Sequence, residues 1–356
     1  MRKALALAER GRGSTSPNPM VGALVVDPAG VIVGRGAHRV AGGPHAEVIA
    51  LRDAGDRARG GTLYCTLEPC AHTGRTGPCA PLVTQAGIRR AVIAMADPNP
   101  RVDGRGLRHL HERGVETVVG VEQAAAARQN AVFLTNMRFG RPHITIKAAV
   151  SIDGCLGAPG LRTRLTGAAA DRRVHRQRAE VDALGVGSET VLVDDPLLTP
   201  RGAYRQRPLT RVIFDRRLRT PPSARVLSTL ETGPVIIMSS ARSVAPGKAG
   251  ALEAAGARVV VVADDDFGTA VRALTDAGVA SLVLEGGGTL HTAALDAGVV
   301  DAVHLYITPR TLGSGGVPWI GDGRIAWESL RDRRATWFGD DLLVEGLVET
   351  HVHGDR

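Results

Sequence analysis

The sequence predicts two consecutive α/β domains, each built on a mixed or parallel sheet. The chain has 356 residues, well over the roughly 150 residues of an average domain. Strand-like and helix-like segments alternate through both halves, which is typical of sheets covered by helices. The segment Arg138–Pro142 interrupts a helical pattern with a glycine and a proline, which indicates a boundary. We therefore expect one domain over residues 1–142 and a second over residues 143–356.

The elements of the first domain follow from apolar runs and from helix signals. Residues 1–10 predict a short amphipathic helix, because their apolar stretch is too short for a signal-peptide core. Pro44 is expected at the first position of a helix, where its missing amide hydrogen costs nothing. The remaining segments are strands over 21–26, 31–37, 62–66, 91–96 and 116–119, and helices over 44–54, from 78 onward, over 106–113 and over 122–137.

The second domain repeats this alternation. Three glycines, Gly286–Gly288, join a predicted strand to a predicted helix. At such a junction backbone amides can approach a pyrophosphate, although the glycines alone also fit a tight turn. The expected strands are 143–150, 181–186, 210–214, 235–238, 258–262, 281–284 and 302–307, with helices over 168–178, near 252, over 269–277 and over 290–297, and a closing hairpin around 339–341.

The composition indicates a globular protein that does not bind nucleic acid. Hydrophobic residues make up 44% and charged residues 22% of the chain, and the formal charge is +8. Of the 44 basic residues only three are lysines, so 41 are arginines. These arginines are spread along both halves without the dense basic block or interleaved aromatics that favour nucleic acid. A positive surface still suits a small phosphorylated substrate.

Apolar runs and cysteines indicate the compartment. No run approaches the roughly 20 residues that span a bilayer, so we expect no membrane partner and a cytoplasmic location. In a reducing cytoplasm the four cysteines are expected as ligands or core residues rather than as disulfides. Cys65 lies in a β-prone run and is expected to be a small buried side chain. Cys155 has no evident role.

His45, Glu47, Cys70 and Cys79 form the strongest functional signal. One imidazole and two thiolates suit zinc, and three protein ligands leave the fourth tetrahedral position for water. Zinc lowers the pKa of such a water to about 7, and Glu47 is then the expected proton carrier. We expect both cysteines at helix starts, where the helix dipole stabilises thiolates. The pattern is the signature of zinc deaminases that act on nucleobases.

Three other interpretations remain open for these four residues. A closed zinc site that only joins loops would need a fourth ligand, and the nearest spare candidate is His72. A nucleic-acid deaminase of the tRNA type, with an accessory nucleotide-binding domain, would use the same ligands. A noncatalytic regulator that binds zinc and a nucleotide is the third alternative.

The spacing of the cysteines carries further information. Eight residues separate Cys70 from Cys79, whereas nucleobase deaminases usually have two. This insertion, with the segments Ser16–Gly22, Gly43–Glu47 and Asp97–Pro100, resembles the deaminase domain of the bifunctional riboflavin-biosynthesis family known as RibD or RibG. The resemblance covers the whole first domain.

This resemblance implies a substrate and a set of site residues. The substrate is 2,5-diamino-6-(5-phosphoribosylamino)pyrimidin-4-one, whose 2-amino group leaves as ammonia. One zinc ion is held by His45, Cys70 and Cys79, and Glu47 is catalytic. Asn18 and His38 hold the base, while His72 and Arg75 meet the ribose phosphate. Each of these last four has a simpler alternative; Asn18, between two prolines, also fits a turn.

The second domain carries its own family signal. The segments Lys147–Gly154, Gly187–Arg201 and Leu284–Leu290 together resemble the reductase domain of the same family, over residues from about 143 to 350. That domain has a dihydrofolate-reductase-like fold and uses NADPH. The resemblance implies that the open carbonyl form of the ribosyl group accepts hydride and becomes a ribityl chain.

The resemblance also implies residues of the reductase site, which we assign from their positions in these segments. Asp194 is the candidate that helps to protonate or orient the nascent alkoxide, or else a hydrogen-bonding cap. The two arginines of the substrate set suit a phosphate. Predicted substrate contacts are Arg178, Leu198, Arg201 and Glu285; predicted cofactor contacts are Ala149, Thr190, Asp194, Gly287, Gly288, Thr289, Leu290, His291, Thr292 and Ala293.

One segment departs from the family pattern. The family commonly has Ser-x-Trp-Ile-Thr where residues 162–166 are Arg-Thr-Arg-Leu-Thr. Either Arg164 replaces the tryptophan and alters the cofactor geometry, or the alignment is shifted by one residue. As a whole, the resemblance implies an N-terminal cytidine-deaminase-like α/β/α sandwich followed by a dihydrofolate-reductase-like α/β domain, in a homo-oligomer with a dimer favoured.

Overall fold

The computed structural model describes residues 1–71, 77–100, 102–243, 247–320, 325 and 327–348. The chain divides into two compact units, Met1–Gly140 and Arg141–Arg356. The division falls two residues before the boundary that the sequence indicates. Each unit has its own sheet and its own buried core.

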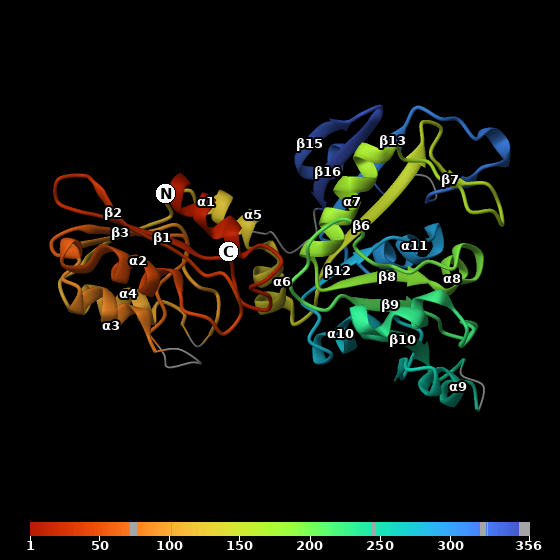
Figure 1. Ribbon diagram of the computed structural model, residues 1–356, viewed down its shortest axis with the longest axis horizontal. Helices are drawn as coiled ribbons and strands as arrows, with labels where there is room; N and C mark the ends of the chain where they lie inside the picture. Colours follow the sequence, from red (N-terminus) through yellow and green to blue (C-terminus); the bar gives the residue numbers. More distant parts are fainter. Residues whose placement is uncertain (72–76, 101, 244–246, 321–324, 326, 349–356) are drawn as a thin grey trace. The chain divides into compact units, whose positions relative to one another are not determined.

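The first unit is built on a five-stranded mixed sheet (Figure 1). Its first two strand pairs are antiparallel and the last two are parallel. The parallel strands therefore end at one edge of the sheet, where loops can bring side chains together. In spatial order the strands are β2 (Ile32–Ala37), β1 (Gly22–Val26), β3 (Thr62–Cys65), β4 (Arg90–Ile93) and β5 (Glu116–Val119).

Helices cover both faces of this sheet. A Cβ atom at Gly22 would overlap the carbonyl oxygen of Ala4, and one at Gly36 would overlap the carbonyl oxygen of Ala46. These two glycines face opposite sides of the pleated sheet, so the helices that press on them form separate layers. The helices are α1 (Arg2–Ala8), α2 (Ala46–Ala54), α3 (Cys79–Gln85), α4 (Arg105–Glu112), α5 (Gln123–Gln129) and α6 (Ala131–Phe139), with short 3₁₀ turns η1 (Glu9–Gly11) and η2 (Gly55–Ala58).

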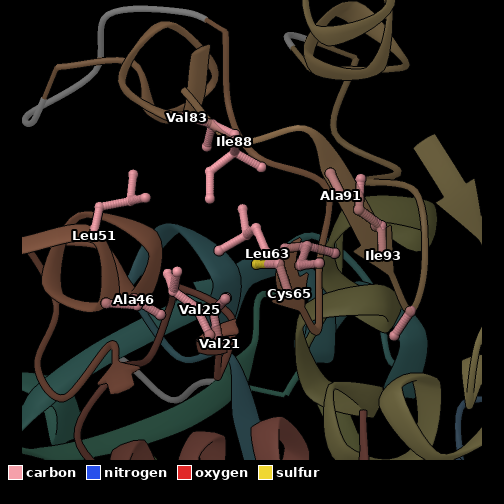
Figure 2. Close-up of a cluster of buried hydrophobic side chains, with 14 of the residues drawn as sticks. Val21, Val25, Ala46, Leu51, Leu63, Cys65, Val83, Ile88, Ala91 and Ile93 are labelled. Atoms are coloured by element: carbon pink, nitrogen blue, oxygen red, sulfur yellow. The ribbon is translucent and has the colours of Figure 1, made fainter. Parts of the chain in front are cut away.

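The core of the first unit lies mainly between β1, β3 and β4 and the helices α2 and α3. Figure 2 shows Leu63 and Cys65 of β3 at its centre, with Leu51 of α2 on one side and Val83 of α3 on another. Cys65 is fully buried. The prediction that this cysteine is a small core residue is therefore confirmed.

The second unit is built on a nine-stranded sheet (Figure 1). Seven neighbouring strands, from β11 to β13, pair in parallel, and the last two pairings, β13 with β16 and β16 with β15, are antiparallel. In spatial order they are β11 (Arg258–Val262), β10 (Val235–Ser240), β9 (Thr210–Phe214), β8 (Ala183–Gly187), β12 (Ser281–Leu284), β6 (His143–Ser151), β13 (Ala302–Thr308), β16 (Asp341–Val348) and β15 (Leu330–Phe338), and a separate pair joins β7 (Cys155–Gly157) to β14 (Val317–Pro318).

Alternate residues of β6 show how this sheet is covered. Ile144 and Ile146 pack with α10 and α11, whereas Ala149 packs with α7 on the other face. The unit is thus also a layered α/β domain. Its helices are α7 (Ala168–Glu180), α8 (Ser188–Asp194), α9 (Lys248–Ala254), α10 (Phe267–Asp276) and α11 (Gly288–Asp296), with 3₁₀ segments η3 (Arg225–Thr232), η4 (Gly313–Gly315) and η5 (Trp327–Ser329).

The order of strands and helices predicted from the sequence is confirmed, with corrections at helix boundaries. Pro44 lies outside α2, because His45 has an extended backbone and occupies the N-cap position. The single helix expected over residues 122–137 is two helices, since Asn130 is non-helical and its side chain pairs with both backbone polar groups of Met20. The helix α8 and the strands β7, β14 and β15 were not predicted individually. Within the described ranges, no helix is both long and apolar enough to cross a membrane.

A buried ion pair anchors the start of the second unit. Two nitrogens of Arg141 donate to the carboxylate oxygens of Asp301 at 2.7 and 2.9 Å, and the Ile144 amide donates to the same carboxylate at 2.8 Å. Both side chains are about one-tenth exposed, at 10% and 11%. Removing one partner of such a pair leaves a charge in a poorly solvated place.

We expect Asp301→Asn to lower the free energy of unfolding of the second unit by about 3 kcal/mol or more, because it removes the buried carboxylate that two nitrogens of Arg141 contact. All three tryptophans lie in this unit, so fluorescence during urea unfolding reports on it alone. Asp276→Asn, at an exposed position of α10, should change the value by no more than about 0.5 kcal/mol. Equal unfolding curves for Asp301→Asn and the unmodified protein would contradict the anchoring role.

Candidate active sites

His45, Cys70 and Cys79 come together at the edge of the first sheet where β3 ends. His45 is the N-cap of α2, and Cys79 is the first residue of α3. Cys70 lies in the loop that follows β3, so the expectation that both cysteines begin helices is correct for Cys79 and wrong for Cys70. The amide of Cys79 nevertheless points at the Cys70 sulfur, at 3.4 Å. One helix start therefore serves both sulfurs.

The distances among these three side chains fit a zinc ion. The Nδ1 atom of His45 lies 3.2 Å from the Cys79 sulfur and 3.5 Å from the Cys70 sulfur. Tetrahedral zinc with ordinary bond lengths would place a nitrogen and a sulfur ligand about 3.5 Å apart. The three ligand atoms all lie within 4.8 Å of one another, and among the described residues they form the one group of this kind. The arrangement leaves room for an exchangeable fourth ligand.

A hydrogen bond between the Cys70 and Cys79 thiol groups shifts their pKa values in opposite directions. The hydrogen bond from Cys79 lowers the pKa of the Cys70 thiol, with a further contribution from His45. The same hydrogen bond raises the pKa of the Cys79 thiol, and burial adds to that effect. A divalent cation between the two sulfurs would stabilise both thiolates, so this pair is suited to a metal rather than to a proton.

Glu47 lies in the first turn of α2, two residues after His45, and lines the same cavity as His45 and Cys70. Its side chain is only 3% exposed. Burial raises the pKa of the Glu47 carboxyl to about 7, while the His45 charge acts in the opposite direction. A carboxyl with a pKa near neutrality can both accept and release a proton at physiological pH. This property is what a proton carrier in hydrolysis requires.

Asn18 and His38 are connected to His45 through the backbone. His38 Nδ1 lies 3.1 Å from the carbonyl oxygen of Pro44, which can only accept, so Nδ1 carries the hydrogen. Burial lowers the pKa of His38, so its ring is neutral and Nε2 accepts from the Asn18 amide at 3.2 Å. The predicted pair Asn18 and His38 is therefore assembled beside the candidate metal ligands.

These residues line one cavity of about 450 Å³. Asp97 and Asn99 also line it; both belong to the Asp97–Pro100 motif, but their residue types and spacing predict no individual role. Burial raises the pKa of the Asp97 carboxyl to about 6. Phe133 and Met137 of α6 supply an apolar wall. A cavity with an apolar wall and several convergent polar groups suits a planar heterocycle.

Glu68 holds the loop that carries Asp97 and Asn99. Its carboxylate accepts hydrogen bonds from the amides of Gly106 at 2.9 Å and Leu107 at 3.2 Å, and from those of Asp97 and Gly104 at 3.2 Å each. Glu68 is 3% exposed and lies two residues before Cys70. It therefore ties the cysteine loop to the far wall of the cavity. The predicted residues His72 and Arg75 lie outside the described residues.

The second unit has a cavity of about 620 Å³. It lies where β8, β9, β10 and β11 end, beside the start of α11, which is the edge where open parallel sheets bind ligands. Among the described residues that line it, three belong to the predicted cofactor set: Thr289, Leu290 and Ala293.

The turn before α11 contains glycines that let its backbone lie close to neighbouring groups. Gly287 has φ of +80°, and a Cβ atom at Gly288 would overlap the carbonyl oxygen of Trp319. A Cβ atom at Gly286 would lie 2.7 Å from Oγ1 of Thr190, so this predicted cofactor residue packs directly against the glycine turn. Free amides at a helix start next to a cavity fit the pyrophosphate of a dinucleotide.

Arg178 and Glu285 of the predicted substrate set contact each other. Nε and Nη2 of Arg178 donate to the Glu285 carboxylate at 2.8 and 2.6 Å, and Nη1 donates to the Thr199 carbonyl at 3.1 Å. Leu198 is buried with a φ of +54°, and the Arg201 amide donates to His175 Nδ1 at 3.1 Å. The segment 198–201 is therefore held against α7, with the Arg201 side chain exposed.

The remaining predicted cofactor contacts are Asp194, Ala149, His291 and Thr292, and their environments differ from one another. Asp194 is the last residue of α8, and burial raises the pKa of its carboxyl. Ala149 lies on β6 opposite Tyr306, on the face that packs with α7. His291 is fully buried and bonds the Leu284 carbonyl and the Trp319 indole, so its side chain is part of the core. Thr292 follows it in α11.

The segment that departs from the family pattern is held at the start of α7. Nη2 of Arg164 donates to Asp171 at 2.6 Å, and the Arg164 carbonyl accepts from Arg310 at 2.9 Å. The Arg164 side chain is 73% exposed. An exposed ion pair thus occupies the place where the pattern predicts an indole.

Comparison with known proteins covers both units. The family model described as "Cytidine and deoxycytidylate deaminase zinc-binding region" matches residues 1–95, and the model described as "RibD C-terminal domain" matches residues 142–344. The riboflavin biosynthesis protein RibD of Aquifex aeolicus is 39% identical over 349 residues, which cover 97% of this chain and 96% of the relative. RibD of Bacillus amyloliquefaciens is 37% identical and covers 100% of this chain and 97% of the relative.

Solved structures give the same result. Form 1 of Acinetobacter baumannii RibD has a TM-score of 0.85 at 35% identity, covering 98% of this chain and 97% of that one. A diaminohydroxyphosphoribosylaminopyrimidine deaminase/5-amino-6-(5-phosphoribosylamino)uracil reductase from Thermotoga maritima has a TM-score of 0.83 at 30% identity, with the same coverage. The predicted fold class of both units is confirmed.

We expect Glu68→Gln to loosen the far wall of the first cavity, because the new amide nitrogen donates where a carboxylate oxygen now accepts. Bonds to charged acceptors contribute about 1.5–3 kcal/mol each, so exchange of the Gly106 and Leu107 amides with deuterium should accelerate by about tenfold or more. Glu116→Gln on the exposed strand β5 is the matched control and should change neither rate. Unchanged exchange in Glu68→Gln would show that the loop does not depend on this carboxylate.

Proposed function

The chain belongs to the RibD family of riboflavin biosynthesis proteins, and on this basis we propose which of its residues carry out each of two reactions. The protein is a bifunctional zinc-dependent deaminase and NADPH-dependent reductase. It deaminates 2,5-diamino-6-(5-phosphoribosylamino)pyrimidin-4-one to 5-amino-6-(5-phosphoribosylamino)uracil and then reduces the ribosyl group to ribityl. We place deamination in residues 1–142 and reduction in residues 143–356.

In deamination, His45, Cys70 and Cys79 hold one zinc ion. Zinc in this position supplies a Lewis acid that makes water a nucleophile at neutral pH. The Glu47 carboxylate would accept one proton from the attacking water and return it to the ring nitrogen, and would then pass the remaining proton of the added hydroxyl to the amine, so that ammonia leaves as the carbonyl forms. Its pKa of about 7 supports both transfers.

The cavity walls orient the pyrimidine. Neutral His38 fixes the Asn18 amide, whose carbonyl oxygen is then available to accept from an amino group of the base. Asp97 and Asn99 provide further polar contacts on the opposite loop, and the Phe133 side chain packs against the ring. We retain His72 and Arg75 as the candidates for the ribose phosphate.

In reduction, the second unit orients NADPH and the open form of the ribosyl group. NADPH supplies the hydride. Ala149, Thr190 and the segment Gly287–Ala293 are the proposed cofactor contacts, with the His291 side chain acting by supporting the turn from within the core. Arg178, Leu198, Arg201 and Glu285 are the proposed substrate contacts. Asp194, also a proposed cofactor contact, helps to protonate the alkoxide that forms when hydride adds to the carbonyl carbon.

Partners and location follow from the same assignment. The enzyme acts on a small phosphorylated pyrimidine, and we propose that it binds no nucleic acid and no membrane. The four cysteines are free thiols in the structure, which supports a reducing compartment and hence the cytoplasm. We propose a homodimer from the family resemblance.

The observation that carries the deaminase assignment is the approach of His45, Cys70 and Cys79 within 4.8 Å beside buried Glu47. The decisive experiment incubates the purified protein with the diamino substrate, with and without NADPH, while ammonia and NADPH are followed separately. Ammonia should appear in both reactions, and NADPH should be consumed only after deamination. NADPH consumption without ammonia release would contradict the proposed order.

We expect Glu47→Gln to retain one equivalent of zinc and to lower the rate of ammonia release by about 10³-fold, because the proton carrier is lost. Zinc content is measured by mass spectrometry after gel filtration. The built-in control is reduction of already deaminated substrate, which should continue at the unmodified rate. Normal ammonia release would remove Glu47 from the mechanism.

For the second unit, Asp194→Asn should slow NADPH oxidation on deaminated substrate by roughly 10²-fold at saturation, because the group that helps to protonate the alkoxide is lost. The exposed Asp276→Asn serves as the control of equal charge. If Asp194 were only a helix-terminal hydrogen-bonding group, thermal stability would fall while the turnover number stayed the same.

A further inference from the structure

His291 is a buried histidine on α11 whose surroundings give it a single hydrogen-bonding arrangement. Its neighbours Leu290 and Ala293 line the second cavity, yet His291 itself is 0% exposed. Burial lowers the pKa of His291 to about 4, so the imidazole is neutral at physiological pH. A neutral imidazole has one nitrogen that donates and one that accepts, so it needs one partner of each kind.

The two partners of His291 come from other segments of the chain. The carbonyl oxygen of Leu284, at the end of β12, lies 3.1 Å from Nε2 and can only accept, so Nε2 carries the hydrogen. Nδ1 then accepts from the indole Nε1–H of Trp319 at 2.8 Å. Both ring nitrogens of His291 and the indole N–H of Trp319 are therefore paired inside the core. Removing either side chain leaves a buried polar group without its partner.

The backbone of Trp319 contacts two further segments. Its amide donates to the Gly154 carbonyl at 3.1 Å, in the turn that follows β6. Its carbonyl oxygen lies against Gly288, the first residue of α11, where a Cβ atom would overlap it. This one residue therefore joins the turn after β6 to the glycine turn, while its indole holds His291.

Both of these turns adjoin residues of the proposed reductase site. The strand β6 carries Ala149, a proposed cofactor contact, and the turn after it is fixed further because the Asp153 carboxylate accepts from the Gly313 amide at 2.7 Å. The glycine turn follows Glu285, a proposed substrate contact that Arg178 binds. A backbone that is already held in its binding geometry lowers the entropic cost of taking up a ligand.

We propose that His291 and Trp319 are positioning residues of the reductase site, which hold the glycine turn in its cofactor-binding geometry and connect it to the turn after β6. This inference rests on the proposed reductase function. His291 then contributes to NADPH binding through its two hydrogen bonds, because the residues of α11 that line the cavity are Thr289, Leu290 and Ala293. Trp319 is not among the described residues that line the cavity, so any effect of NADPH on its indole passes through these contacts.

The test compares variants that keep or remove the two hydrogen bonds. His291→Leu removes both, whereas His291→Gln retains one donor and one acceptor and can restore both. Trp319→Phe removes only the indole donor and keeps an aromatic ring in the core. Trp337→Phe, at a 68% exposed position of β15, is the matched control. Titration calorimetry with NADPH and thermal unfolding are measured on each full-length variant.

His291→Leu and Trp319→Phe should weaken NADPH binding by about tenfold or more, because part of the binding energy must then order the turn. His291→Gln should stay within about threefold of the unmodified protein, and Trp337→Phe within about twofold. A lower midpoint of thermal unfolding with unchanged NADPH affinity in Trp319→Phe would reduce the pair to core packing and overturn the inference. The same conclusion would follow if His291→Gln bound NADPH as weakly as His291→Leu. If His291→Leu does not fold, Trp319→Phe and His291→Gln still decide the question.

A second readout reports on the connection between the two turns. The three tryptophans give three indole N–H resonances in ¹⁵N-labelled protein, and those of Trp319 and Trp337 are identified by their loss in the two phenylalanine variants. NADPH should shift the Trp319 resonance and leave that of Trp337 in place, and the Trp319 shift should be lost in His291→Leu. A Trp319 resonance that NADPH does not move would overturn the inference alone. Failure of the unmodified protein to bind NADPH would overturn the reductase assignment as well.

Discussion

The deaminase site depends on how closely α2 approaches the sheet. A side chain at Gly36 of β2 would overlap the carbonyl oxygen of Ala46, the residue between His45 and Glu47. A side chain at Gly106 would overlap the carbonyl oxygen of Pro69, the residue before Cys70. Glycine at these two positions therefore lets the backbone segments that carry three of the four site residues reach their places. The chemistry of zinc and of Glu47 follows from backbone packing rather than from loop flexibility.

The deaminase and reductase sites differ in how many elements of an α/β sheet they use. Hydrolysis needs few groups held tightly, and the deaminase donors converge from the starts of two helices and one loop on a single buried point. Hydride transfer needs a long cofactor and a sugar to meet, so the reductase residues extend along several strand ends. The Arg178–Glu285 pair and the segment from Leu198 to Arg201 are fixed by α7, whereas the cavity beside α11 stays open. Within the second sheet, the predicted substrate residues are thus held in fixed positions, while the cavity beside α11 remains accessible.

Sequence reasoning succeeded where chemistry depends on local spacing and failed where it depends on distant contacts. His45, Glu47, Cys70 and Cys79 could be chosen from residue type and order, and the structure brings the three ligands together. The helix start was misplaced because Pro44 was assigned to its first turn, whereas His45 is extended. The cofactor role of His291 stays a prediction, and the structure adds that Trp319 and Leu284 hold its side chain in the core. The role of Glu68 has no local signal, since its carboxylate binds amides 29 or more positions away. Asp97 belongs to a motif of the family, but its place in the wall of the cavity depends on the fold.

Several arginines have structural roles that need no polyanionic partner. Arg211 is fully buried and donates to the carbonyls of Thr229 and Gly233. Arg205 donates to three carbonyl groups at the end of α7, and Arg141 is bound to Asp301. A guanidinium can satisfy several carbonyl groups at once, which an ammonium on a flexible stem does less well, so such positions favour arginine over lysine. Part of the charge of +8 therefore lies where no nucleic acid can reach it.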